Sequence, residues 1–275
     1  MLFALNGLST MHSNLLTDIR VTREAGYDGI EMTEYKLLRY LENGGSYAGL
    51  RTILEASCLI PVGICTAKSI EVQHTTQRNQ MLAEVELLSQ AACAIGCSTV
   101  QLIPLCSLDG RSMEDILYLT TQNLIEIAKI GQTYGVRYQL EPIAFSGIHS
   151  LKTCLKLIEN TGASNIGLVI DFWHLWAGEE TEPEEVAKLD KNIIYGVHFC
   201  DGIRKPAGAP WDEKAFRSYL PGEGEINIAT WVKAVKDTGY DGIWSAELYS
   251  PKHWEYDLLE IARNLRACME RYLYS

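Results

Sequence analysis

Four side chains that commonly bind metal ions stand directly after short apolar runs: Glu141, Asp171, His198 and Glu247. Such runs, entered from a turn or a glycine, are typical of parallel strands that are buried on both faces. Functional groups collect at the carboxyl ends of such strands, so we expect these four side chains at one rim. Three carboxylates and one imidazole suit a divalent cation, namely Mn²⁺, Mg²⁺, Co²⁺ or Zn²⁺. The sequence therefore predicts that the four residues bind a metal ion.

Asp171 alone has a second interpretation, because an aspartate just after a strand often caps the helix that follows. Its apolar run covers residues 166–170. Similar runs at 137–140, 193–197 and 242–246 also end in a metal-binding type of side chain. This ordered recurrence favours the ligand interpretation of Asp171.

The predicted metal site suits proton transfer next to a carbonyl group. A cation held by four protein groups leaves positions for two adjacent substrate oxygens, a carbonyl and its neighbouring hydroxyl. It would polarise the carbonyl and stabilise the enediolate that forms when the α proton leaves. An isomerase or epimerase then needs one group that removes the proton and one that returns it. Glu141 and Glu247, which we expect on opposite sides of the metal, are the candidates for these catalytic roles.

Further candidates would contact the substrate rather than the metal. His174 lies on the same predicted rim, and Arg204 lies in a long loop, 201–220, that could form a lid or a wall of the site. Trp173 and Trp254 could stack on a sugar or cyclitol ring. By spacing alone, the histidine could equally be a cap, the arginine a member of a surface ion pair, and the tryptophans part of the core.

The elements that must position these residues alternate along the chain. Apolar runs that predict strands cover residues 2–6, 29–32, 61–66, 99–103, 137–140, 166–170, 193–197 and 242–246. Between them lie patterns with helical spacing, for example at 79–95 and 112–134. Eight alternations of strand and helix predict a (β/α)₈ TIM barrel, an α/β fold that forms a single domain over residues 1–275.

Composition narrows the class of protein. The chain has 275 residues, of which 47% are hydrophobic and 21% charged, and its net charge is −11. An acidic surface argues against nucleic acid and anionic membrane as partners, so a small carbohydrate or cyclitol is the expected partner. A homo-oligomer is compatible with the sequence. The eight cysteines form no CxxC motif, and the amino terminus lacks a signal-peptide pattern, so we expect a cytoplasmic protein with reduced thiols.

The chain resembles the xylose isomerase-like superfamily of sugar isomerases and epimerases. The matching motifs are LEP at 140–142, GLVIDFWH at 167–174, VHFCDGIR at 197–204, LPGEG at 220–224 and SAEL at 245–248. The last third is most similar to inosose isomerase-like proteins of inositol catabolism. The resemblance implies a metal-dependent isomerase or epimerase that acts on a keto-sugar or keto-cyclitol. It also implies that His174 and Arg204 contact substrate oxygens.

Other activities occur on the same barrel. Ketohexose 3-epimerases of the superfamily carry an acid where this chain has Gly147, which argues against that type. Inosose and dehydroshikimate dehydratases share the metal ligands and the first proton removal, so the sequence does not separate an isomerase from a lyase. Repair endonucleases need additional histidines, and His253 is the only histidine from 201 onward. A barrel that binds a ligand or partner without turnover is the remaining alternative.

Overall fold

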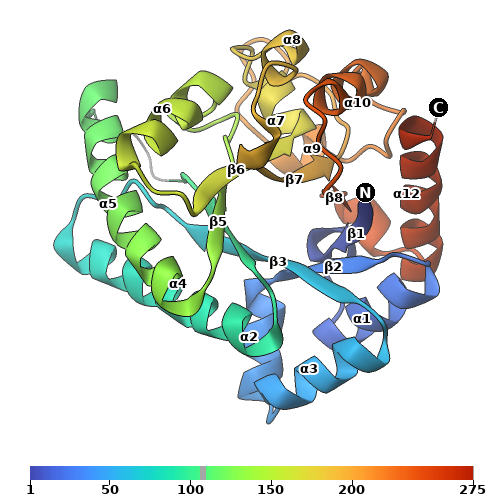
Figure 1. The fold of residues 1–275 in the computed structure, drawn as a ribbon. Helices are drawn as coiled ribbons and strands as arrows, with labels where there is room; N and C mark the ends of the chain where they lie inside the picture. Colours follow the sequence, from blue (N-terminus) through green and yellow to red (C-terminus); the bar gives the residue numbers. More distant parts are fainter. Residues whose placement is uncertain (106–109, 275) are drawn as a thin grey trace.

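Eight parallel strands close into a barrel in the computed structural model, which describes residues 1–105 and 110–274 (Figure 1). Each strand pairs with the next along the chain, and β8 pairs with β1. The strands are β1 (Leu2–Asn6), β2 (Gly29–Thr33), β3 (Ile60–Lys68), β4 (Thr99–Ile103), β5 (Arg137–Leu140), β6 (Ile166–Asp171), β7 (Ile194–Phe199) and β8 (Ile243–Ala246). The predicted TIM barrel is therefore confirmed.

Two strand ends differ from the sequence-based prediction. Strands β6 and β7 continue through Asp171 and His198, which we had placed just after the strands. In the register of the sheet these two residues are direct neighbours. Both side chains are thus held by the sheet itself rather than by loops.

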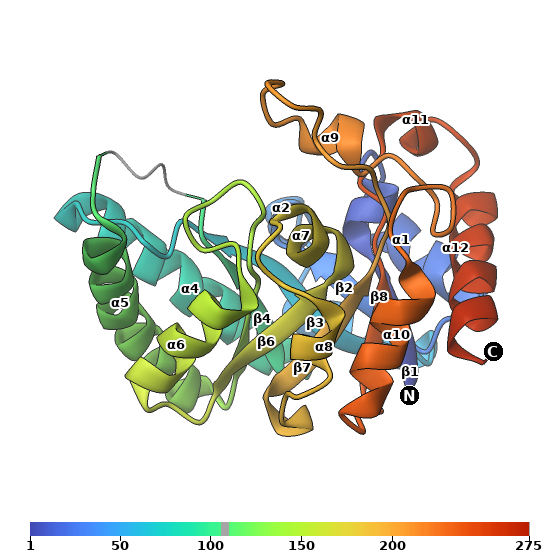
Figure 2. The same ribbon diagram turned by 90° about the horizontal axis from the view of Figure 1, so that it is seen from above.

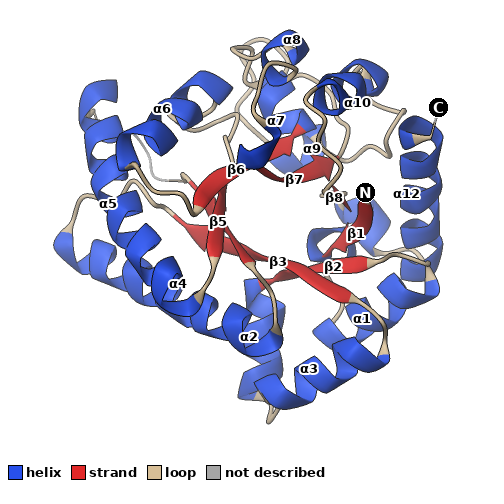
Figure 3. Cartoon of the chain, viewed as in Figure 1, coloured by secondary structure: helices blue, strands red, loops and turns tan. Residues whose placement is uncertain are grey.

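Helices surround the ring of strands (Figure 3). The longer ones are α1 (Leu15–Glu24), α2 (Glu34–Glu42), α3 (Tyr47–Ala56), α4 (Thr75–Ile95), α5 (Met113–Tyr134), α6 (Leu151–Thr161), α10 (Ile228–Asp237) and α12 (Leu258–Leu273). Side-chain caps begin several of them; the Ser150 hydroxyl, for example, accepts a hydrogen bond from the Thr153 N–H at the start of α6. Across residues 1–105 and 110–274, no helix combines the length and apolar character that a membrane span requires.

Short elements gather at the carboxyl-terminal rim of the barrel. They include the 3₁₀ turn η1 (Gly7–Thr10), α7 (Phe172–Ala177), α9 (Glu213–Phe216) and α11 (Pro251–Trp254); α8 (Pro183–Val186) and η2 (Lys191–Ile193) lie before β7. Figure 2 shows α9 and α11 at one end of the barrel, while the chain begins at the other end. Loops at this rim can therefore build a site over the strand ends.

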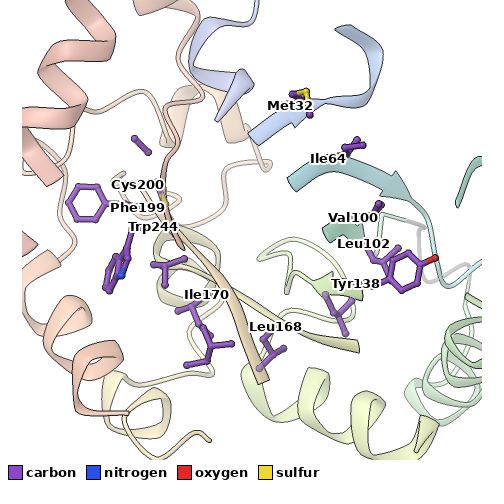
Figure 4. Packing of buried hydrophobic residues seen from close by; sticks show 14 of the residues in the cluster. Met32, Ile64, Val100, Leu102, Tyr138, Leu168, Ile170, Phe199, Cys200 and Trp244 are labelled. Atoms are coloured by element: carbon purple, nitrogen blue, oxygen red, sulfur yellow. The ribbon is translucent and has the colours of Figure 1, made fainter. Parts of the chain in front are cut away.

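The core is a continuous cluster of buried hydrophobic side chains (Figure 4). Leu168 and Ile170 of β6, for example, are 0% and 1% exposed, and Trp244 of β8 is fully buried. Burying each such side chain stabilises the fold by about 1.5–3 kcal/mol. Cys200 belongs to this core, the described cysteines are all free, and Cys106 lies outside the described residues.

A buried ion pair fixes η1 to the barrel. Lys36, on α2, is fully buried, and its ammonium group lies 2.7 Å from Asp18 Oδ2. The same ammonium donates hydrogen bonds to the carbonyl oxygens of Gly7 at 2.8 Å and Thr10 at 2.7 Å. Since every proton of the ammonium finds an acceptor, the desolvated charge is compensated where the chain turns over the rim.

We predict that Lys36→Met lowers the free energy of unfolding by about 3–5 kcal/mol, because it leaves the Asp18 carboxylate buried without its counter-charge. Urea denaturation followed by circular dichroism measures the loss. The matched control is Arg51→Met, which breaks the Arg51–Glu55 pair, whose side chains are 58% and 66% exposed. It should cost less than about 1 kcal/mol. Equal losses in the two variants would show that the buried Lys36–Asp18 pair matters no more for stability than the exposed pair.

Candidate metal centre

Four successive strands bring the predicted metal ligands together. Glu141 directly follows β5, Asp171 ends β6, His198 lies on β7, and Glu247 directly follows β8. One potential ligand atom from each residue lies within 4.8 Å of those of the other three. All four side chains are buried, and we call them the quartet.

The imidazole of His198 points its Nδ1 atom at the three carboxylates. Nδ1 lies 2.8 Å from Glu141 Oε1, 3.3 Å from Glu247 Oε2 and 3.6 Å from Asp171 Oδ2. The other ring nitrogen, Nε2, lies 3.2 Å from Glu31 Oε2. A neutral imidazole with its proton on Nε2, toward Glu31, presents a lone pair on Nδ1 to the quartet.

Glu31 was not among the residues selected from the sequence. It lies inside β2 and is 3% exposed. Its carboxylate accepts hydrogen bonds from Asn6 Nδ2 at 3.0 Å and from Gln139 Nε2 at 2.9 Å. Burial alone would raise the pKa of Glu31, but the charge of His198 and the hydrogen bonds that the Glu31 carboxylate accepts lower this pKa to about 2. The signal in the sequence was an acid in the middle of an apolar strand.

Arg217, which directly follows α9, reaches into the quartet. It is 3% exposed, and its Nη2 atom donates to Asp171 Oδ2 at 2.8 Å and to Glu247 Oε2 at 2.6 Å. Burial would raise the pKa of Asp171, but the charge of Arg217 and those of the nearby histidines hold it well below its usual range. Burial would likewise lower the pKa of Arg217, but Asp171 and Glu247 raise it well above its usual value.

The donor set fits one divalent cation. Carboxylate and imidazole ligands at about 2.0–2.2 Å from an ion lie at most about 4.4 Å from one another, close to the 4.8 Å limit within which the quartet's atoms fall. Burial raises the pKa of Glu141, although His198 and His174 act in the opposite direction. Such a group of buried carboxylates calls for positive charge, and a divalent ion supplies it.

A cavity of about 310 Å³ adjoins the quartet. Glu141, Glu247, His174 and Arg217 contribute to its lining. The other lining residues are Leu8, Met11, Glu34, Tyr35, Cys65, Thr66, Lys68, Gln101, Ile103, Leu105, Ile143, Phe145, Glu213 and Tyr249. This mixture of a few converging polar groups with apolar and aromatic walls is typical of a small-molecule site.

His174 lies where the sequence predicted, beside the quartet. The Ala144 N–H donates to its Nδ1 at 3.2 Å, and its Nε2 lies 3.1 Å from Arg217 Nη1 and 3.5 Å from Glu213 Oε1. The backbone N–H of His174 donates to Asp171 Oδ1 at 2.7 Å. Asp171 therefore caps α7 and contributes to the quartet as well, so its two interpretations from the sequence are compatible.

Arg204 does not line the cavity. Its side chain is 43% exposed and forms an ion pair with Glu179 at 2.9 Å. The guanidinium group lies 4.2 Å from the centre of the Trp176 ring. The structure thus places Arg204 on the surface, which differs from the substrate contact predicted for it, and Arg217 reaches the cavity instead.

The two tryptophans selected from the sequence also lie outside the cavity lining. Trp173 is fully buried, and its Nε1 donates to the Ile203 carbonyl oxygen at 3.2 Å. Trp254 donates from Nε1 to the Leu8 carbonyl oxygen at 2.8 Å and packs against the Tyr249 ring. Their positions match the alternative of core packing, while Tyr249 itself lines the cavity.

Asp201 holds the loop that carries Arg217. Its buried carboxylate accepts hydrogen bonds from the backbone N–H groups of Gly202, Gly222, Gly224 and Ile226, at 2.7, 2.8, 3.0 and 3.3 Å. The glycine-rich stretch at 221–226 therefore binds a protein carboxylate. Because one side chain gathers both ends of the loop, the segment between them is directed over the cavity, where Glu213 and Arg217 form part of the wall.

Comparison with known proteins places the chain in a family. The sequence model of the xylose isomerase-like TIM barrel matches residues 19–268. The inosose isomerase of Halalkalibacterium halodurans is 26% identical over 258 residues, which cover 93% of this chain and 90% of the relative. The inosose isomerase of Bacillus subtilis is 25% identical, with 89% and 87% covered. A crystal structure of the IolI protein with a bound zinc atom is 23% identical, covers 99% of this chain and 98% of its own, and superposes with a TM-score of 0.92. The chain belongs to the xylose isomerase-like TIM barrel family.

Proposed function

We propose that this protein is a divalent-metal-dependent isomerase or epimerase that moves a proton at the carbon next to the carbonyl of a keto-sugar or keto-cyclitol. The observation that carries the proposal is the quartet, in which two glutamates line the same cavity as His174 and Arg217. The inosose isomerases among the relatives and the zinc bound to IolI support it. The proposed site lies in a small cavity, in keeping with a small substrate.

In this proposal Glu141, Asp171, His198 and Glu247 hold the metal ion, and Mn²⁺, Mg²⁺, Co²⁺ and Zn²⁺ all suit the donor set. The bound ion would polarise the substrate carbonyl and so acidify the neighbouring C–H bond. Glu31 acts through His198: its Oε2 lies 3.2 Å from Nε2, so its charge favours a proton on Nε2 and leaves the Nδ1 lone pair directed at the quartet.

Glu141 and Glu247 are the proposed proton carriers. They follow β5 and β8, with β6 and β7 between them, so they approach the cavity from two directions. Gln101 Nε2 donates to Glu141 Oε2 at 2.7 Å, and Arg217 Nη2 donates to Glu247 Oε2 at 2.6 Å. Apart from the 2.8 Å contact between His198 Nδ1 and Glu141 Oε1, each carboxylate is thus fixed by one donor, and its remaining lone pairs can accept a proton from the substrate.

Arg217 and His174 are the residues proposed to contact substrate oxygens. Both are buried and both line the cavity, and Arg217 Nη1 lies 3.1 Å from His174 Nε2. Glu213 accepts a hydrogen bond from Nη1 of Arg217 at 2.8 Å and holds the guanidinium plane in place. Nη2 of the guanidinium is held by Asp171 and Glu247. Its buried Nε–H has no hydrogen-bond partner among the described residues, so it is the donor proposed to meet an oxygen that gains negative charge during the reaction.

We predict that the zinc- or manganese-loaded protein, incubated in D₂O with inososes and ketohexoses, introduces deuterium at the carbon next to the carbonyl. Glu141→Gln and Glu247→Gln should each lower the exchange rate by about 10²–10⁴-fold, because the amide cannot carry the proton. Proton NMR and mass spectrometry measure the exchange, and protein stripped with EDTA should show none.

The matched control for these variants is Glu24→Gln on the exposed surface of α1, which should exchange at the wild-type rate. Metal-dependent loss of water from inosose or dehydroshikimate, with no isomerised product, would replace the isomerase proposal by a lyase. Exchange that persists in Glu141→Gln or Glu247→Gln would remove that residue from the proton-carrying role.

We predict that Glu31→Gln weakens Zn²⁺ binding by about 10–100-fold, because His198 loses the carboxylate that orients its ring. Competition with a chromophoric chelator measures the dissociation constant, and circular dichroism of the metal-free protein checks the fold. Glu24→Gln again serves as the control. A change of less than twofold would show that Glu31 does not act through the metal ligand.

We predict that Arg217→Met lowers kcat/KM by about 10²–10³-fold, the loss typical of removing a donor to a charged transition state. Arg204→Met should alter it by less than about threefold, because Arg204 forms only a surface ion pair. Steady-state kinetics of the two variants separates the sequence-based candidate from the residue found in the structure. A larger loss in Arg204→Met than in Arg217→Met would instead support Arg204 as the residue that contacts the substrate.

A further inference from the structure

A second polar group lies across the cavity from the quartet. Glu34 is the first residue of α2, directly after β2, and Lys68 is the last residue of β3. In the closed barrel β2 and β3 lie opposite β6 and β7. The Lys68 Nζ atom lies 2.6 Å from Glu34 Oε1, and both residues line the cavity. The pair thus faces the part of a bound substrate that is remote from the proposed reacting carbon.

The Glu34 carboxylate is fixed in this position. Its side chain is 12% exposed, and its Oε2 atom accepts a hydrogen bond from the Thr66 N–H at 3.1 Å. Lys68, by contrast, is 47% exposed. The carboxylate is therefore the anchored member of the pair, and the ammonium reaches it from the more open side of the cavity.

Gln101 adds an acceptor that has no protein partner. Its Nε2 atom donates to Glu141 Oε2 at 2.7 Å, which fixes the orientation of the amide. Its Oε1 atom is buried, and no described residue donates a hydrogen bond to it. The residue is 4% exposed and lines the same cavity. A buried acceptor without a partner is costly, so a donor on a ligand would stabilise it.

The charges on this side of the cavity suit a neutral ligand. The charge of Lys68 is already balanced by Glu34. Glu84, on α4, is close enough to interact with both: burial and the charge of Glu34 raise its pKa, and Lys68 lowers it. An anionic ligand group here would be repelled by these two acids, and Lys68, which could attract it, is already paired with Glu34. A hydroxyl, by contrast, can donate to Glu34 or Gln101 and accept from Lys68.

We propose that Glu34, Lys68 and Gln101 form a hydroxyl-binding subsite that selects an uncharged polyol and rejects its phosphate ester. Glu34 and Lys68 would meet the end of the substrate remote from the reacting carbon, and Gln101, beside Glu141, the part nearer to it; this assignment rests on the proposed function. Apolar neighbours in the lining, such as Ile103 and Phe145, would cover the C–H face of the polyol.

Isothermal titration of the zinc-loaded full-length protein with myo-inositol and with myo-inositol 1-phosphate tests the subsite without turnover, since neither probe has a carbonyl. We expect the wild type to bind myo-inositol at least about tenfold more tightly than its phosphate. Glu34→Gln keeps an acceptor for the Thr66 N–H but removes the charge. It should weaken myo-inositol binding about tenfold, the loss of a charge-assisted hydrogen bond, and should strengthen phosphate binding because Lys68 becomes unpaired.

Lys68→Met and Gln101→Leu complete the series, and each should weaken myo-inositol binding without strengthening that of the phosphate. The control pair is Lys233 and Asp237, an exposed lysine–acid ion pair on α10. Neither Lys233→Met nor Asp237→Asn should change either affinity. Thermal unfolding of each variant confirms that it is folded.

Three results would overturn the proposal: no binding of myo-inositol to the wild type, phosphate binding as tight as that of the polyol, or unchanged affinities in Glu34→Gln. The deuterium-exchange assay separates this failure from failure of the proposed function. Polyol selectivity that depends on Glu34, with no exchange on any keto substrate, would refute the isomerase and keep the subsite. Deuterium exchange on a keto substrate, together with ligand affinities that do not change in Glu34→Gln, would refute the subsite and keep the isomerase.

Discussion

The contact between His198 and the acids on both its sides is the interaction on which the rest of the site depends. Nδ1 faces three carboxylates of the quartet, while Nε2 faces Glu31. Burial would lower the pKa of this imidazole, but Glu247, Glu31 and Glu141 raise it well above its usual value. Before a metal ion binds, the protonated ring therefore offsets the repulsion among these acids; a bound cation would take over that role and leave the ring neutral, with its Nδ1 lone pair free to bind.

Arg217 provides the second source of positive charge, and its position depends on backbone geometry rather than on a strand. The loop that carries it leaves β7 and returns to α10, and the Asp201 carboxylate binds backbone N–H groups at both ends. Such a network fixes the loop without using any of its long side chains. Arg217 and Glu213 are therefore available to form part of the cavity wall.

The sequence predicted the fold and the quartet because each depends on local patterns. In a parallel barrel, a residue at the carboxyl end of a strand lies at one rim. Eight buried strands with helices between them commonly form a TIM barrel. Glu31 was missed because it lies within β2 rather than at the end of a strand.

Arg204 and Arg217 show where local pattern fails. Both lie in the same loop, and the resemblance to the family, rather than spacing, pointed to Arg204. Which of them turns inward is decided by the Asp201 network, by the packing of Arg204 on Trp176, and by the pairing of Arg217 with Glu213. None of these contacts leaves a periodic signal. The tryptophans were misplaced for a related reason: a large aromatic side chain near a rim serves packing as readily as binding.

The quartet and the Glu34–Lys68 pair lie in different halves of the barrel, and the two halves have different proposed roles. Strands β5 to β8 present the acids and the imidazole, whereas the chain from β2 to β4 presents Glu34, Lys68 and Gln101. Glu31 on β2 and Gln101 on β4 support the ligands from this side, whereas Glu34 and Lys68 pair with each other, so a substitution at Glu34 or Lys68 can reshape the cavity while leaving the ligand geometry intact. The wall that Glu34 and Lys68 form can therefore change to suit another substrate while the reaction centre stays as it is.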